Sequence, residues 1–225
     1  MVEKNPGPVR PMRIFRWFEV VFDVLYLLIA AYLGADMLRN HTGTVGLLSG
    51  IMALVLAGGD AFHLIPRMVV AVSGNKEQLN RLLGVGKFVT SVTMTFFYVL
   101  LWVIGIMLFT PELAQGWTVA VLSLAGLRII LCLFKQNGWT NLKPSVRWAM
   151  LRNIPFLLLG AMTAFLFGAH SHFVGSLEYM WLAITLSFVF YVPVVVGAYK
   201  NPKLGMLMIP KTCMYIWMLL MCSKL

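Results

Sequence analysis

Residues 44–66 read TVGLLSGIMALVLAGGDAFHLIP, an apolar run that closes with two ionisable residues, Asp60 and His63. About 20 such residues in a helix cross the ~30 Å hydrocarbon core of a bilayer. A carboxylate inside such a segment costs about 2 to 3.5 kcal/mol on insertion scales unless it faces a polar interior, and it marks a functional site by default. The run therefore predicts a membrane-spanning helix and a site buried between helices.

The rest of the chain repeats this apolar pattern. Of its 225 residues, 60% are hydrophobic and 12% are charged, so no soluble domain of this length could cover itself with polar surface. No segment alternates as a barrel strand would, so the bundle is helical. We expect an all-α, polytopic membrane protein with one domain, residues 1–225. Its seven transmembrane helices are predicted at residues 17–37, 44–66, 87–109, 117–134, 148–167, 179–196 and 207–221.

Two segments bear on the boundaries of this bundle. The first hydrophobic run follows basic residues as a signal peptide would, but it is long and carries Glu19 and Asp23, so we interpret it as an uncleaved first helix. Residues 68–86 form the longest predicted loop and mix valines and leucines with charges. We expect this loop to lie in the inner interface as a short amphipathic segment.

Basic residues predict the orientation, because they are retained on the cytoplasmic side of short loops. With the N-terminus inside and the C-terminus outside, the outer side keeps only Arg39 and Lys224, while Arg128 lies within a helix. The formal net charge of +10 then follows from topology, and no nucleic-acid partner is expected. We expect an integral protein of a bacterial cytoplasmic membrane.

Polar residues gather at one depth, in the inner third of every predicted helix. Glu19, Asp23 and Tyr26 share one helical face, and a matching stripe on the second helix holds Asp60, His63 and Arg67. The later helices bring Lys87, Thr90 and Ser91; Arg128; Arg152 and Asn153; Tyr191; and Lys211, Thr212 and Tyr215. We therefore predict a polar cavity that opens to the inner leaflet.

Each of these residues also has a purely structural interpretation. Lys87, Arg152 and Lys211 are close enough to the interface for their head groups to reach water. Asp60 has a structural alternative as the partner of Arg67 or Arg128 in a buried ion pair. His63 alone is more typical of a packed histidine than of a metal ligand.

One part of the chain resembles a known family. Residues 59–67, GDAFHLIPR, precede residues 82–87, LLGVGK, and a helix rich in Phe and Tyr. This arrangement resembles the core of the lysoplasmalogenase (YhhN-like) family, over roughly residues 57–102. A weaker likeness continues from residue 187 to residue 220, through a basic turn with Lys200 and Lys203.

The resemblance implies hydrolysis of the vinyl-ether bond of a lysoplasmalogen, which releases an aldehyde and a glycerophospho head group without a cofactor. Asp60 is the family acid that carries over to this chain. Tyr191 stands where the family usually has a second acid. The expected partner is thus a lipid or lysophospholipid within the bilayer.

Vinyl-ether cleavage begins with protonation of carbon, which a positioned carboxylic acid can perform. We predict Asp60 as the proton donor, Asp23 as the group that orients water or acts as base, and His63 as the residue that orients Asp60 or shares its proton. Arginine forks suit phosphate. The predicted substrate-binding residues are Arg67, Arg128, Arg152, Lys87 and Tyr191.

Two other classes of protein fit the same pattern. A zinc-dependent seven-helix lipid hydrolase would need three good ligands, whereas His63 is the only histidine within the predicted spans. A small transporter, lipid-binding protein or sensor would use buried acids beside cations as a proton relay or ligand clamp. We predict no metal site, and the sequence carries no signal for an oligomeric state.

The orientation can be tested with reporters fused after Leu225. A phosphatase that folds only outside the cytoplasm should be active there, and a fluorescent protein that folds only inside should be dark. The reverse result would contradict the predicted orientation.

Overall fold

The computed structural model describes residues 10–40, 43–73, 76–109, 114–141, 145–197 and 200–225. Its long helices are α1 (Arg10–Asn40), α2 (Thr44–Ser73), α3 (Lys76–Phe109), α4 (Ala114–Leu133), α5 (Val146–His170), α6 (Met180–Gly197) and α7 (Met208–Cys222). Short 3-10 turns are η1 (Lys135–Asn137), η2 (Ser171–Phe173), η3 (Gly175–Leu177) and η4 (Pro202–Leu207). Within the described residues, seven spans are long and apolar enough to cross a membrane. The prediction of an all-α, seven-helix integral membrane protein is confirmed.

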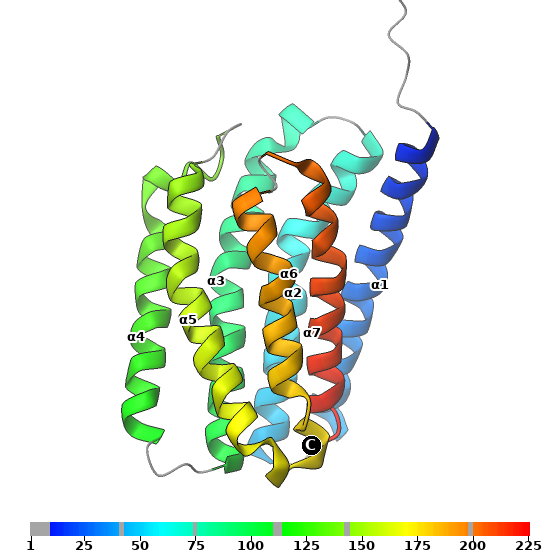
Figure 1. Cartoon of the computed structure of the whole chain (residues 1–225). Coiled ribbons are helices and arrows are strands. Elements are labelled where there is room, and N and C mark those ends of the chain that lie inside the picture. The colour runs from blue at the N-terminus through cyan, green and yellow to red at the C-terminus, as the bar shows by residue number, and fades with distance from the viewer. Residues whose placement is uncertain (1–9, 41–42, 74–75, 110–113, 142–144, 198–199) are drawn as a thin grey trace, which may run out of the picture.

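The helices form one bundle in which each helix packs against the next along the chain (Figure 1). The ring closes where α7 packs against α1 and α2, and α3 also contacts α5. We call the end of the bundle where α1 begins the N-terminal end. The connections α2 to α3, α4 to α5 and α6 to α7 lie at this end, and the C-terminus lies at the opposite end (Figure 1).

The predicted loop at residues 68–86 is wrong. Helix α2 continues through Pro66 to Ser73, and α3 already begins at Lys76. Contacts with the segment after α4 stabilise the added turns of α3, because the Asn80 side-chain amide donates to the Thr140 carbonyl at 2.7 Å. The other predicted helices differ from the observed ones mainly in length at their ends, with α1 and α5 longer than expected.

Pro66 lies inside α2 because α3 approaches unusually closely there. A proline has no N–H, so the Phe62 carbonyl lacks its usual helical donor. The α3 backbone at Gly86 lies so near this carbonyl that a Cβ at position 86 would overlap its oxygen. Neighbouring helices commonly cover backbone groups that a proline frees in membrane helices, which explains why the helix does not end at Pro66.

The two halves of the bundle differ in polarity. The half toward the C-terminus is closed by fully buried apolar side chains: Met37, Met52, Leu101, Ile104, Phe167, Met180, Ile184, Met218 and Leu219. Among the described residues, the buried charged ones are Asp23, Arg128 and Lys211, and all three belong to the N-terminal half. The apolar half therefore supports a polar half that holds the candidate site.

The close contact of α2 with α3 predicts that Gly86→Ala is destabilising. The added Cβ meets backbone rather than a flexible side chain, and such overpacking costs about 1–3 kcal/mol. Gly58→Ala is the matched control, because a Cβ at position 58 meets no atom within 4 Å. Thermal unfolding in detergent should show a lower midpoint for Gly86→Ala alone; equal midpoints would contradict the close helix contact.

Candidate functional site

Asp60 lies at the centre of the polar half, and its first partner comes from another helix. The Tyr26 hydroxyl on α1 donates to Asp60 Oδ2 at 2.7 Å. Asp23, one turn earlier on α1, is 6% exposed, and its carboxylate is close enough to Asp60 for the two charges to interact. The structure thus brings together the two predicted catalytic acids and adds a tyrosine to them.

The backbone around Asp60 is fixed by α3. The Thr90 hydroxyl donates to the Gly59 carbonyl at 2.8 Å. A Cβ at position 59 would overlap the Thr93 side chain, so only glycine allows this approach. The glycine before Asp60 therefore lets α3 pack tightly and hold the acid at a defined position.

Arg67 pairs with an acid other than Asp60, the partner considered for it from the sequence. It forms an ion pair with Glu19 of α1, whereas Asp60 bonds to Tyr26. The alternative of an Asp60–Arg67 pair is therefore not what the structure forms. The Glu19–Arg67 pair joins α1 to α2 on the N-terminal side of Asp60, and Arg67 already has an acid to neutralise it.

Lys211 was expected to reach the interface, but it is only 7% exposed. Its ammonium lies 4.6 Å from the centroid of the Tyr191 ring and 4.9 Å from that of Tyr215. It also interacts electrostatically with Asp60. This residue was not among the predicted site residues, although its helical spacing to Tyr215 was a signal that the two share a face.

Arg128 is the most deeply buried cation of the site, with 2% of its surface exposed. Its guanidinium carbon lies 3.3 Å from the centroid of the Phe156 ring on α5. In the part of the chain that the structure describes, neither its Nε nor its Nη1 has a hydrogen-bond partner. The alternative of an Asp60–Arg128 ion pair is also not formed.

Arg152 and Tyr191 are each held by a side-chain amide. Arg152 Nη1 donates to Asn137 Oδ1 at 2.9 Å, and its guanidinium covers the Trp139 ring at 4.1 Å. The Tyr191 hydroxyl donates to Asn153 Oδ1 at 2.9 Å. Asn137 lies in η1, outside the helices, so helical spacing gave no signal for its role.

His63 and Lys87 complete the set of predicted site residues. His63 interacts electrostatically with Lys87 and with Lys211. Its Nδ1 is buried and makes no hydrogen bond, so this nitrogen does not orient Asp60. Among the residues that the structure describes, no three His, Cys, Asp or Glu side chains are grouped so that they could hold a metal ion.

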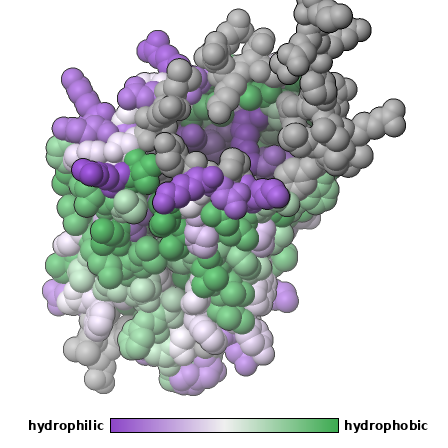
Figure 2. Space-filling model, turned by 45° about the horizontal axis from the view of Figure 1, so that its top comes forward, coloured by the Kyte–Doolittle hydropathy of each residue, from purple (hydrophilic) through white to green (hydrophobic). Residues whose placement is uncertain are grey.

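These side chains come from all seven helices and meet at one end of the bundle. Seen toward that end, the molecule has a recess with hydrophilic residues in its floor, whereas the side of the bundle that faces the viewer is mostly hydrophobic (Figure 2). The predicted shared depth of the polar residues is therefore matched by a common location. Such an arrangement can bind a polar head group and transfer a proton to it.

Comparison of the chain with protein families, with curated proteins and with solved structures gave no match.

The Tyr26–Asp60 contact predicts that the two side chains are energetically coupled. Tyr26→Phe removes the hydroxyl from a buried carboxyl and should lower the free energy of unfolding by about 1–3 kcal/mol. Once Asp60→Asn is present, the same change should cost less, with a coupling energy of about 0.5–3 kcal/mol.

Thermal or denaturant unfolding of the two single variants and the double variant measures this coupling. Tyr32→Phe is the matched control, because Tyr32 lies on the same helix and is 69% exposed. Strictly additive effects of Tyr26→Phe and Asp60→Asn would mean that the Tyr26 hydroxyl stabilises Asp60 no more than Asn at this position, and would contradict the predicted coupling.

Proposed function

We propose that this integral membrane protein hydrolyses the vinyl-ether bond of a lysoplasmalogen-type lipid, with Asp60 as the proton donor. The observation that carries the proposal is the Tyr26–Asp60 hydrogen bond with Asp23 beside it, inside a polar recess between membrane helices. The sequence resemblance to lysoplasmalogenases, which includes Asp60, supports the same reaction. The positive-inside pattern of the loops supports a reaction at the cytoplasmic leaflet.

The reaction needs one acid and one base at a short separation. Asp60 gives its proton to the outer carbon of the vinyl ether, and the electrons of the double bond form the new C–H bond, leaving an oxocarbenium ion. Water then adds to the carbon bonded to oxygen and loses a proton to Asp23. The hemiacetal hydroxyl then gives its proton, through water, to the glycerol oxygen while the C–O bond to that oxygen breaks, which yields an aldehyde and the free glycerol hydroxyl. A separate proton transfer from Asp23 through water restores Asp60.

The surroundings of Asp60 suit a donor. Tyr26 occupies Oδ2, which leaves Oδ1 as the atom that carries the transferable proton. Asp60 is partly buried, and a site with little water protects a reactive oxocarbenium ion until the positioned water adds. Lys211, held between two tyrosine rings, is the nearby cation whose charge can balance the carboxylate after transfer.

A lipid-binding protein without catalysis is the second candidate. Arg128 has nitrogens without a partner in the described structure, and a buried cation of this kind favours an anionic ligand whether or not a reaction follows. Binding of a lysophospholipid without aldehyde release would support this candidate over the enzyme.

Replacing Asp60 with Asn tests the proposed reaction directly. The change keeps the volume and the ability to accept from Tyr26 but removes the acidic proton. Aldehyde release from lysoplasmalogen by the purified protein in detergent should fall by ~10²-fold or more, the usual contribution of a general acid.

Asp36→Asn is the matched control, because Asp36 lies on α1 in the opposite half of the bundle and accepts from Asn40 at 2.6 Å. It should retain the wild-type rate. A folded Asp60→Asn protein with full activity would remove Asp60 as donor, and absence of aldehyde from the wild type would overturn the proposed reaction.

A further inference from the structure

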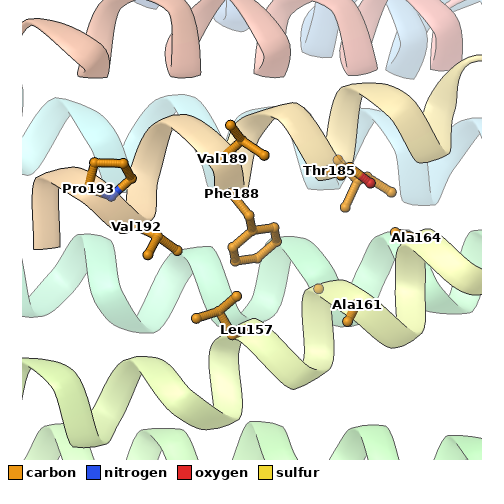
Figure 3. A pocket seen from close by; sticks show the side chains of 10 residues that line it. Leu157, Ala161, Ala164, Thr185, Phe188, Val189, Val192 and Pro193 are labelled. Atoms are coloured by element: carbon orange, nitrogen blue, oxygen red, sulfur yellow. The ribbon is translucent and has the colours of Figure 1, made fainter. Parts of the chain in front are cut away.

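A groove on the outer face of the bundle runs between α5 and α6. Its larger part has a volume of about 470 Å³, within the usual range of about 300–1,000 Å³ for ligand sites. Figure 3 shows Phe188 reaching from α6 toward α5, with Leu157 and Ala161 on the α5 side. Leu157 and Val189 are both exposed, so the groove opens sideways to the bilayer.

The groove continues toward the N-terminal end of the bundle. Leu157 and Val192 line both the larger part and a second part of about 240 Å³. The second part reaches Asn153 and Tyr191, which are joined by a hydrogen bond of 2.9 Å. The groove is thus apolar along its length and polar where it ends.

Two aromatic rings link this groove to buried cations. Tyr191 lines the groove, and its ring also contacts the Lys211 ammonium. The Phe156 ring contacts Phe188 of the groove, with 5.0 Å between centroids, and the Arg128 guanidinium stacks on Phe156. Arg152 and Lys211 both interact electrostatically with Arg128, so the three cations form one cluster.

Arg128 itself indicates a ligand. Its side chain is almost fully buried, and two of its nitrogens have no partner within the described part of the chain. A buried guanidinium with free donors is costly to the fold and suits a planar or tetrahedral oxyanion, since its fork binds phosphate through paired N–H groups. Among the described residues, no carboxylate forms an ion pair with Arg128. An ion pair that these residues do form joins Arg67 to Glu19.

We propose that this site binds a single-chain phospholipid, with its hydrocarbon chain in the α5–α6 groove and its phosphate on Arg128, Arg152 and Lys211. The lipid enters between α5 and α6 at the Asn153–Tyr191 contact, the polar end of the groove. This proposal rests on the proposed function and adds where the hydrocarbon chain and the phosphate of the substrate bind. A lipid phosphate and a free phosphate ion share the same chemistry at Arg128, and only the lipid also fills the groove.

Binding can be measured without any reaction by native mass spectrometry of the full chain in detergent. The probe is 1-acyl lysophosphatidylglycerol, which has no vinyl-ether bond, compared with a monoacylglycerol of the same chain length and with inorganic phosphate. The lysophospholipid should bind at least tenfold more tightly than either. Failure of aldehyde release from lysoplasmalogen would leave this result untouched, so the two proposals fail separately.

Two variants test the two halves of the site. Arg128→Gln removes the buried charge and Ala161→Trp fills the groove, and each should weaken lysophospholipid binding at least tenfold. The controls are Arg147→Gln, an exposed cation on α5, and Ala120→Trp, an exposed position on α4; both should bind as the wild type does. Without lipid, Arg128→Gln should melt no lower than the wild type, and added lipid should raise the melting temperature of the wild type but not that of Arg128→Gln.

Three outcomes would overturn the proposal. If monoacylglycerol binds as tightly as the lysophospholipid, the site does not recognise the phosphate. If inorganic phosphate binds as tightly as the lysophospholipid and Ala161→Trp has no effect on binding, the groove does not hold the hydrocarbon chain. The site would then bind only the free ion. Unchanged binding in Arg128→Gln would place the head group elsewhere.

Discussion

A polar side chain within the hydrocarbon core of a membrane has no water to bind, so it needs a partner from a neighbouring helix. This constraint organises the N-terminal half of the bundle. Tyr26 on α1 bonds to Asp60 on α2, Tyr191 on α6 bonds to Asn153 on α5, and Lys211 on α7 rests against Tyr191. These contacts join helices that are adjacent in the ring. The polar residues therefore determine how the helices face one another at that end, while apolar packing determines the other.

The sequence predicted the parts of the fold that depend on local information. Hydrophobic length identified seven helices, and helical spacing put Asp60, His63 and Arg67 on one stripe. The predicted end of α2 at Pro66 was wrong, because it relied on the general tendency of proline to end a helix. Here the freed carbonyl of Phe62 is covered by the backbone at Gly86, and a contact between two helices leaves no mark in either segment alone.

In the candidate site too, the sequence predicted what depends on local information and missed what depends on contacts between helices. Shared depth correctly grouped residues from every helix, because alternate helices cross the membrane in opposite directions. The pairing within the group could not be read from depth, since it depends on helix rotation and on which helices are neighbours. Arg67 therefore pairs with Glu19 rather than Asp60, and Lys211 is buried between tyrosines instead of reaching the interface. The unpaired nitrogens of Arg128 are likewise a property of packing, not of spacing.

The closed apolar half has an electrochemical consequence. Leu101, Ile104 and Phe167 belong to a layer with no accessible surface, and an apolar, close-packed layer offers a proton no chain of donors along which to move. Asp23 and Asp60 belong to the polar half, so this layer separates them from the opposite end of the bundle. A proton that either carboxyl group gains or loses has no path through the layer, so proton transfer at these groups dissipates no gradient across the membrane.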